Sequence, residues 1–413
     1  MEATVAAIEP GHLAGTAAVP PSKSAAHRAV VCAALAAGTS HIGNVEFSQD
    51  ILATLGAAQQ LGAKVERGEH ELTITGRGNA DGFATITRPV FCNESGSTLR
   101  FILPLFSLTA QKVRFTGAGR LMQRPQEIYA QLFERQGLRF EQNEQGITIF
   151  GRLCPGTFTL PGNVSSQFIS GLLFATPLME APSTIEVRAP FESRSYVDLT
   201  TDAMQKFGVK VSVRARKDGS ATYKVAAPQH YAAADMDVEG DYSQAAFLAM
   251  LGSTVGGITI TGLPSGSHQG DRVILDILKQ CGAKFERSGS HVTFHRSLLK
   301  AVEIDLADCP DLGPVLIALG CFCSGTTIIR NAGRLRIKEC DRIAAMQEEL
   351  AKMGGTVKAD GDTLTIEGCA LHKPTAPLNG HNDHRIVMAM AGRRPAGGHR
   401  GGQRGQQKLA GFL

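Results

Sequence analysis

Hydrophobic and polar positions alternate with a period of two in five short stretches, each of which contains a glycine near its start. In "LGAKVERGEHELTITG", which begins at Leu61, two alternating runs flank a polar turn. The other four stretches are "QGLRFEQNEQGITIFG", "FGVKVSVRARKDGSATYKV", "CGAKFERSGSHVTFH" and "MGGTVKADGDTLTIEG". A period of two around a Gly, Asp or Asn turn is typical of a β-hairpin. The sequence therefore predicts five hairpins.

These predicted hairpins recur at a nearly constant spacing. Their marker glycines follow one another at steps of 75, 71, 74 and 72 residues, at Gly62, Gly137, Gly208, Gly282 and Gly354. An amphipathic helix is predicted before each hairpin, as in "DRVILDILKQ" and "DRIAAMQEELAKM". A repeat on this scale indicates one supersecondary unit per period, here mixing helix and strand.

A second kind of segment places a polar cluster at the start of an apolar helix. It occurs as "SKSAAHRAVVCAALAAG", "NESGSTLRFILPLFSLTA", "SSQFISGLLFATPLM", "YSQAAFLAMLGSTVGG", "DLGPVLIALGCFCSG" and "NDHRIVMAMAG". Because these helices are apolar on nearly all sides, we expect them to be buried among other elements. Six copies predict an α/β chain of six repeats, arranged as two domains of three.

The polar clusters contain more than a helix cap requires. One Ser, Thr, Asp or Asn is enough for a cap, whereas these clusters carry Lys-Ser with Arg, Ser-Ser-Gln, or Asp-His-Arg. Free N–H groups and the helix dipole already favour anions at a helix N-terminus. Six such ends, converging from two domains, predict a cleft for a polyanionic substrate.

Length and composition agree with two globular domains. The chain has 413 residues, of which 43% are apolar and 19% are charged, and it contains nine scattered cysteines. The spacing of those cysteines predicts reduced thiols in a cytoplasmic protein rather than a zinc or disulfide framework. We also expect no secretory signal and no membrane span, since no apolar run approaches about 20 residues.

The positive net charge does not indicate a nucleic-acid partner. The formal charge is +4, but residues 391–413 alone contribute +5, so the rest of the chain carries 4 − 5 = −1. The basic residues of this tail are Arg393, Arg394, Arg400, Arg404 and Lys408. A body without basic excess makes nucleic acid an unexpected partner.

Eight motifs together resemble the EPSP synthase family of enolpyruvyl transferases. They are "PSKSAAHR", "NESGSTLRF", "GRLMQRP", "NVSSQFISGLL", "EGDYSQAAF", "DCPDLGP", "RIKECDR" and "HNDHRI", and the resemblance runs from about Ile8 to about Met390. It implies a two-domain inside-out α/β barrel built from six βαβαββ-type repeats, three per domain. One domain would comprise residues 1–20 and 239–413, the other residues 21–238, with the active site in the cleft between them.

The resemblance also implies a reaction. Family members move the enolpyruvyl group of phosphoenolpyruvate onto the 5-hydroxyl of shikimate 3-phosphate through a tetrahedral intermediate, which then eliminates phosphate. No metal and no organic cofactor are expected, the partners are the two small-molecule substrates, and the protein is expected to be a monomer that binds neither nucleic acid nor membrane.

The family pattern implies two sets of substrate contacts. For shikimate 3-phosphate they are Lys23, Ser24, Arg28, Ser165, Ser166, Gln167, Ser193, Asp311 and Lys338, with Tyr196 as a possible wall of the pocket. For phosphoenolpyruvate they are Lys23, Gly96, Arg124, Gln167, Arg342 and Arg385. Forked arginine donors suit carboxylate and phosphate, and a glycine lets the backbone approach a ligand closely.

Three residues are assigned to catalysis by the same resemblance. Asp311 is the expected base for the 5-hydroxyl, with the neighbouring Asp308 as its competitor. Glu339 is the expected acid for C3 of phosphoenolpyruvate, and Lys23 is expected to contact both substrates. Because cations around a carboxylate keep it ionised, an acid role for Glu339 requires burial or a proton that arrives with the substrate.

The chain departs from the family pattern after about Ala391. The ending "AGRRPAGGHRGGQRGQQKLAGFL" contains seven glycines and a proline where the family has a helix and a strand. We hypothesise a shifted reading frame that alters the sixth repeat. The family's C-terminal lysine has Lys408 as its only candidate in this chain.

Three other interpretations stay open on the sequence alone. A sister transferase acts on UDP-N-acetylglucosamine, but that family has a reactive cysteine before "RP", and the loop of this chain, "TGAGRLMQRP", has none. The altered tail would also be compatible with a non-catalytic binder of phosphorylated ligands. A Gly/Arg tail could act as an RNA-binding arm, although the body of the chain lacks a basic excess.

Overall fold

The computed structural model of the chain describes residues 14–79 and 82–391. Contacts divide these residues into two compact units. Unit 1 contains residues 14–20 and 240–391, and unit 2 contains residues 21–239. The chain leaves one unit and enters the other near Pro20 and again near Glu239. Within unit 1, Asp241 N donates to Pro20 O at 2.9 Å, and within unit 2, Ser22 N donates to Glu239 O at 2.7 Å.

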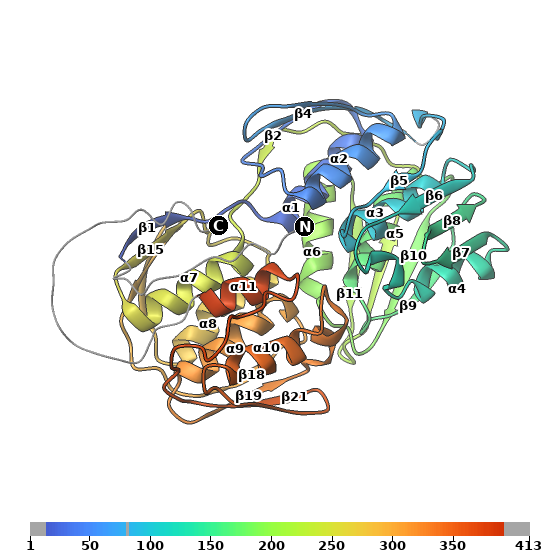
Figure 1. The fold of residues 1–413 in the computed structure, drawn as a ribbon. Coiled ribbons are helices and arrows are strands. Elements are labelled where there is room, and N and C mark those ends of the chain that lie inside the picture. The colour runs from blue at the N-terminus through green and yellow to red at the C-terminus, as the bar shows by residue number, and fades with distance from the viewer. Residues whose placement is uncertain (1–13, 80–81, 392–413) are drawn as a thin grey trace. The chain divides into compact units, whose positions relative to one another are not determined.

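All six apolar segments form helices, as predicted. In unit 2 they are α1 (Lys23–Leu35), α3 (Gly96–Ser107) and α5 (Ser166–Ala175), and in unit 1 α7 (Tyr242–Val255), α9 (Gly313–Phe322) and α11 (His384–Ala391). Within each unit the helices of this set pack against one another (Figure 1). Four of them, α1, α3, α5 and α7, have capped N-termini, since the side chains of Ser22, Ser95, Ser165 and Asp241 accept backbone N–H groups.

The five predicted hairpins are also confirmed. They pair β3 (Lys64–Arg67) with β4 (Leu72–Arg77), β7 (Arg139–Asn143) with β8 (Gly146–Phe150), β11 (Val211–Ala215) with β12 (Ala221–Val225), β16 (Lys284–Ser288) with β17 (His291–His295), and β20 (Val357–Asp360) with β21 (Thr363–Glu367). The helices before them are α2 (Gln49–Leu61), α4 (Glu127–Arg135), α6 (Arg194–Lys206), α8 (Ile274–Gln280) and α10 (Arg342–Ala351).

The marker glycines explain how each of these helices turns into its hairpin. All five have a φ angle between 68° and 105°, in the left-handed region that side chains disfavour. A glycine just past the last helical turn lets the chain leave the helix and enter the first strand. The regular spacing of these glycines in the sequence therefore marks the ends of five helices.

Every hairpin is extended into a small mixed sheet by the same scheme. Its second strand pairs antiparallel with β2 (Ala36–Gly43), β6 (Val113–Thr116), β10 (Ser183–Arg188), β15 (Ile258–Thr261) or β19 (Thr326–Arg330). That strand in turn pairs parallel with one or two further strands. The parallel pairs are β2 with β13 (Tyr231–Ala232) and β14 (Met236–Asp237), β6 with β5 (Val90–Phe91), β10 with β9 (Thr157–Pro161), β15 with β1 (Gly15–Ala18), and β19 with β18 (Glu303–Asp305). Among the described residues, three such sheets belong to unit 2 and two to unit 1.

Short 3₁₀ turns connect several elements. They are η2 (Leu121–Gln123), η3 (Thr176–Leu178), η4 (Gly270–Val273), η5 (Pro310–Leu312) and η6 (Gly333–Ile337). The chain is thus an α/β protein of several small mixed sheets. Its closure into an inside-out barrel stays a prediction, and the predicted alteration of the last repeat falls mainly on residues 392–413, outside the described residues.

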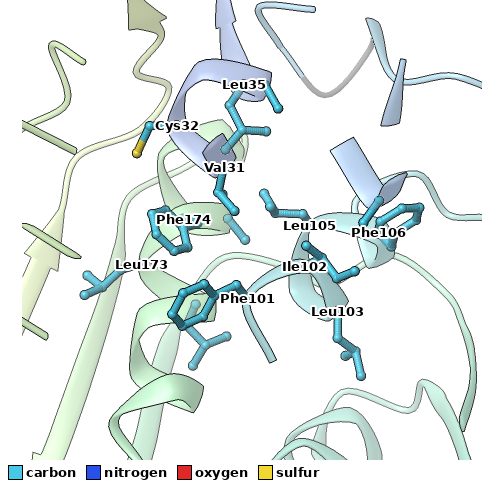
Figure 2. Close-up of a cluster of buried hydrophobic side chains, with 14 of the residues drawn as sticks. Val31, Cys32, Leu35, Phe101, Ile102, Leu103, Leu105, Phe106, Leu173 and Phe174 are labelled. Carbon is cyan, nitrogen blue, oxygen red and sulfur yellow. The ribbon is translucent and has the colours of Figure 1, made fainter. Parts of the chain in front are cut away.

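Each unit has its own hydrophobic core. Figure 2 shows part of the core of unit 2, where Val31, Phe101 and Phe174 come from α1, α3 and α5. The rings of Phe101 and Phe174 meet edge to face, with centroids 5.3 Å apart. A side chain on Gly171 of α5 would overlap the carbonyl oxygen of Arg100 on α3, so the absence of a side chain permits this close packing. None of the described helices is both long enough and apolar enough to cross a membrane.

Candidate active site

In unit 1, three cationic side chains surround the carboxylate of Asp311. Lys338 Nζ lies 3.1 Å from Asp311 Oδ1, Arg342 Nη1 lies 3.4 Å from the same oxygen, and Arg385 Nη2 lies 3.0 Å from Oδ2. Asp311 sits on η5 just before α9, and 20% of its side chain is exposed. Four residues that the resemblance assigns to substrate contacts are therefore brought together within one unit.

Local sequence explains why these side chains converge. Arg342 is the first residue of α10, which Asp341 caps by accepting from Ile343 N and Ala344 N at 3.1 Å. Arg385 is the second residue of α11, and Asp383 Oδ1 caps this helix by accepting the Arg385 backbone N–H at 2.9 Å. Helix starts from two different repeats thus present their arginines to one carboxylate.

The surrounding cations determine the ionisation of Asp311. Burial alone would raise the pKa of this carboxyl, but Arg385, Lys338 and Arg342 outweigh burial and hold the pKa well below its usual range. Burial in turn lowers the pKa of Lys338. Asp311 is therefore a carboxylate at neutral pH. The competing Asp308, by contrast, is an exposed residue.

Arg342 is the most deeply buried of the three cations, with 1% of its side chain exposed. Besides Asp311 it contacts Asp383, through Nε at 2.7 Å, and Glu339, through Nη2 at 2.8 Å. Burial would lower the pKa of Arg342, but Glu339, Asp311 and Asp383 raise it overall. Three cations and three carboxylates therefore balance one another in this group.

Sequence reasoning missed Asp383. Its side chain is fully buried; it holds the guanidinium of Arg342 and caps α11 by accepting the backbone N–H of Arg385. One carboxylate thus orients both predicted arginine clamps. The signal was present in "HNDHRI", where an Asp stands two residues before the arginine at a helix start.

In unit 2, the residues of "PSKSAAHR" lie at the start of α1. Lys23 Nζ lies 2.8 Å from Asp50 Oδ2, and 34% of the Lys23 side chain is exposed. Ser24 contributes its carbonyl oxygen to Arg28 Nη1 at 2.7 Å. The Lys23 ammonium is thus positioned by a carboxylate and is still accessible to solvent.

Arg28 is more deeply buried than the sequence suggested. Its Nε donates to Thr200 Oγ1 at 2.8 Å and its Nη2 donates to the Tyr196 carbonyl at 2.7 Å, while the guanidinium lies over the ring of Phe101. Burial lowers the pKa of Arg28 to about 10. Arg28 therefore ties α1 to α6, and a contact with substrate stays a prediction.

Arg100, a second residue that sequence reasoning missed, connects several of the predicted phosphoenolpyruvate contacts in unit 2. Arg100 Nη1 donates to Gln167 Oε1 at 2.8 Å, and Arg100 Nη2 donates to the Pro125 carbonyl at 3.0 Å. Its guanidinium also lies 4.6 Å from the ring centre of Phe168. Arg100 thus connects Gln167 with the loop that carries Arg124. Its place in "NESGSTLRF", four residues after Gly96, was the available signal.

The contacts of Gln167 and Arg124 follow from this arrangement. Gln167 Nε2 donates to Ser97 Oγ at 2.9 Å, so both ends of the Gln167 amide are fixed. A Cβ atom built on Gly96 would lie 3.0 Å from Arg124 Nη1, which shows how closely this arginine approaches the helix start. Gly96, Arg124 and Gln167, all predicted contacts of one ligand, are therefore connected through α3.

The remaining predicted residues lie at two further helix starts of unit 2. Ser165 caps α5 and Ser166 is its first residue, with 5% exposed. Ser193 precedes α6, is 1% exposed, and has a φ angle of 54°, a conformation that costs energy for a residue other than glycine. Strain of this kind is often found at functional sites.

Comparisons with known proteins agree on one family. A family profile described as EPSP synthase (3-phosphoshikimate 1-carboxyvinyltransferase) matches residues 8–392. A 3-phosphoshikimate 1-carboxyvinyltransferase from Clostridium kluyveri is 43% identical over 389 residues, covering 93% of this chain and 89% of the relative. One from Clostridioides difficile is 40% identical over 393 residues, with the same coverage of both chains.

Solved structures show the same similarity in three dimensions. An EPSP synthase from Acinetobacter baumannii superposes with a TM-score of 0.72 at 25% identity, covering 94% of this chain and 91% of that protein. The enolpyruvyl transferase NikO from Streptomyces tendae has a TM-score of 0.68 at 17% identity, which shows a shared fold alone.

Proposed function

The chain belongs to the EPSP synthase family, and we infer from this that it transfers the enolpyruvyl group of phosphoenolpyruvate to the 5-hydroxyl of shikimate 3-phosphate. The observation that carries this inference is 43% identity to a 3-phosphoshikimate 1-carboxyvinyltransferase over 93% of the chain. The reaction produces 5-enolpyruvylshikimate 3-phosphate and inorganic phosphate, by addition followed by elimination.

We propose that Asp311 is the base for the 5-hydroxyl. Its carboxylate is ionised and partly exposed, so it can accept a proton from a bound hydroxyl group. The same three cations that keep it ionised make it a weak base in the free protein. Anionic substrates that pair with Lys338 and Arg385 would neutralise part of the positive charge that faces Asp311. The pKa of Asp311 would then rise, and the carboxylate would become a stronger base when the hydroxyl is in place.

Glu339 is the proposed acid for C3 of phosphoenolpyruvate. Its carboxyl is 30% exposed and lies 2.8 Å from Arg342 Nη2. When Arg342 and Arg385 bind the carboxylate or phosphate of the substrate, less positive charge faces Glu339, and protonation becomes easier. In this proposal the carbon is protonated as the hydroxyl adds to C2, and the elimination step returns a proton to a carboxylate.

Unit 2 supplies the proposed contacts for the remaining substrate groups. Lys23, Ser24, Arg28, Ser165, Ser166, Gln167 and Ser193 are proposed to bind shikimate 3-phosphate, and Lys23, Gly96, Arg124 and Gln167 to bind phosphoenolpyruvate. Hydroxyl, amide and cationic donors of this kind stabilise phosphate and the charge that develops during addition. The proposal requires both units to act on the same pair of substrates. A cytoplasmic location and a monomeric state also stay predictions.

Product analysis with purified protein tests this function. We expect phosphate release only when shikimate 3-phosphate and phosphoenolpyruvate are both present, together with one equivalent of the enolpyruvyl ether by mass spectrometry. UDP-N-acetylglucosamine in place of shikimate 3-phosphate should give no phosphate. Binding of both ligands without turnover would contradict the proposal and favour the non-catalytic binder.

A further inference from the structure

Four cysteines of unit 1 surround the C-terminal end of α9, and the proposed reaction uses none of them. Cys321 lies in the last turn of α9 and Cys323 directly follows this helix, while Cys281 follows α8 and Cys369 follows β21. The first three are at most 3% exposed, and Cys369 is half-buried. All four are free thiols in the structure.

Cys321 and Cys369 form one contacting pair. The backbone N–H of Cys369 donates to the Cys321 carbonyl at 2.9 Å, and burial together with the nearby Cys369 thiol raises the pKa of Cys321. Neighbouring Gly368 lies so close to the Cys323 carbonyl that any side chain there would overlap it. Backbones joined in this way lie within the roughly 4.4–6.8 Å between Cα atoms that a disulfide spans.

Cys281 and Cys323 form the second pair, in which the interaction of the two thiols lowers the pKa of Cys281 and raises the pKa of Cys323. The chain around Leu299 and Lys300 holds their backbones together. Lys300 N donates to the Cys281 carbonyl at 2.8 Å, and Ser324 N, next to Cys323, donates to the Leu299 carbonyl at 2.9 Å. Both thiols belong to the core of unit 1, where neighbours restrict their movement.

The arrangement indicates two thiol pairs rather than a metal site. Cys321 and Cys323 are two residues apart, and the cysteine that most affects the pKa of each is a different one, Cys369 for Cys321 and Cys281 for Cys323. A structural zinc site needs all of its sulfur ligands around one point. In the part of the chain that the structure describes, the only group of three potential metal ligands with closely spaced atoms is Glu348, Glu349 and His381.

We propose that the two cysteine pairs are a redox-modification site, at which a peroxide converts Cys281–Cys323 and Cys321–Cys369 into disulfides. The bonds would fasten the C-terminal end of α9 to the end of α8 and to the segment after β21. Asp311 lies before the opposite end of α9, so the modification would not touch the proposed base.

The chemistry balances with one hydrogen peroxide per disulfide. The Cys281 thiolate attacks a peroxide oxygen, so that an S–O bond forms, the O–O bond breaks, and the departing hydroxide becomes water by taking the Cys323 proton. Cys323 then attacks the Cys281 sulfur; the S–S bond forms, the S–O bond breaks, and a second water leaves with a proton from solvent. Two thiols are oxidised and one peroxide is reduced to two waters.

The two pairs differ in which thiol reacts first. The interaction with the Cys323 thiol lowers the pKa of Cys281, which favours the thiolate that attacks peroxide. Burial raises the pKa of Cys321 to about 12, so in the other pair the half-buried Cys369 is the thiol that peroxide reaches first. Peroxide is small enough to reach such sulfurs during local opening of the fold.

Peptide mapping of the whole protein tests the proposal. Purified protein is treated with a few equivalents of hydrogen peroxide, its free thiols are alkylated, and the digest is analysed by mass spectrometry. Before alkylation, the mass of the intact protein should fall by about 4 Da, about 2 Da for each disulfide. The digest should contain two linked peptides, one that pairs Cys281 with Cys323 and one that pairs Cys321 with Cys369. The single buried thiols Cys32 and Cys92 of unit 2 are internal controls and should be recovered alkylated.

Two further measurements keep the proposal falsifiable. Oxidation should raise the thermal midpoint of the protein by about 4 °C or more, and dithiothreitol should reverse the change, because each bond restricts the unfolded chain. A Cys281→Ala variant should lose the first linked peptide and keep the second. Absence of either predicted disulfide, a bond between Cys321 and Cys323, or an unchanged midpoint would overturn the proposal.

Discussion

Arg100 shows how a residue without a predicted role can organise those that have one. Its guanidinium holds the amide of Gln167 at 2.8 Å and the Pro125 carbonyl at 3.0 Å, and so fixes one proposed phosphoenolpyruvate contact, Gln167, and the neighbour of another, Arg124. We regard Arg100 as a positioning residue. It resembles Asp383 in unit 1, which orients Arg342 and the start of α11.

Replacing Arg100 with methionine should therefore weaken binding of phosphoenolpyruvate. A hydrogen bond to a charged group contributes about 1.5–3 kcal/mol, and about 1.4 kcal/mol corresponds to tenfold in affinity. We expect Arg100→Met to raise KM for phosphoenolpyruvate about tenfold, because both Gln167 and the loop of Arg124 lose a hydrogen bond. KM for shikimate 3-phosphate should rise less, because only Gln167 is also a proposed contact of that substrate. Steady-state kinetics measure both values. Arg114→Met, at an exposed arginine of β6, is the matched control and should behave like the wild type. Equal changes in both KM values would contradict this role.

His27 makes a second prediction at the residue scale, because its ring is buried in the core of unit 2. Its Nδ1 lies 2.7 Å from Thr54 Oγ1, and burial lowers its pKa from 6.5 to about 3. Between these two values the unfolded chain binds a proton that the folded chain does not bind. Folding stability contributed by a neutral His27 is therefore complete above pH 6.5 and is lost as the pH falls towards 3, by up to about 1.4 kcal/mol per pH unit.

Urea unfolding at several pH values measures this effect. The wild type should lose up to about 3 kcal/mol more than His27→Gln between about pH 6.5 and pH 4. The variant cannot take up the proton, so its unfolding free energy should depend less on pH. His295→Gln, at an exposed histidine, should retain the pH dependence of the wild type. A His27→Gln profile parallel to that of the wild type would contradict the prediction.

At the scale of elements, the sequence predicted the repeats well because local rules control them. Period-two alternation and a glycine at each helix end specified all five hairpins, and apolar runs behind polar clusters specified all six buried helices. Which strands join each hairpin in a sheet was not predicted. The partners come from distant parts of the chain, as when β1 near the N-terminus pairs with β15, and no local pattern encodes such a pairing.

Close packing of α3 against α5 depends on Gly171, which meets residues far from it in the sequence. A Cβ atom at this position would overlap the Arg100 carbonyl and the Tyr129 hydroxyl, and a backbone atom cannot move aside cheaply. Overpacking a core typically costs about 1–3 kcal/mol. We expect Gly171→Ala to lower the thermal midpoint by several degrees, measured by calorimetry.

The matched control is Gly56→Ala on α2, where nothing lies within 4 Å of the added atom. Alanine is favoured over glycine in a helix by about 0.5–1 kcal/mol, so this variant should be as stable as the wild type or more stable. A Gly171→Ala protein as stable as Gly56→Ala would show that the two helices have room between them.

At the scale of the whole molecule, the sequence identified the candidate residues, and the structure showed which of them contact one another. The cations around Asp311 come from two separate motifs, and sequence alone could not show that they share one carboxylate. Resemblance to a family assigned Arg28 to substrate, whereas its buried contacts with Thr200 and Tyr196 depend on packing of distant helices. Charge compensation of this kind is a property of the folded chain, because it depends on burial as much as on residue type.

The central claim is that Asp311, held ionised by Lys338, Arg342 and Arg385, is the base of an enolpyruvyl transfer. Phosphate release with both substrates at saturation, compared between the wild type, Asp311→Asn and the exposed neighbour Asp308→Asn, tests it most directly. General base catalysis contributes about 10²–10⁴-fold, so kcat of Asp311→Asn should fall at least about a hundredfold while Asp308→Asn stays within twofold of the wild type. A fully active Asp311→Asn protein that melts like the wild type would contradict the account.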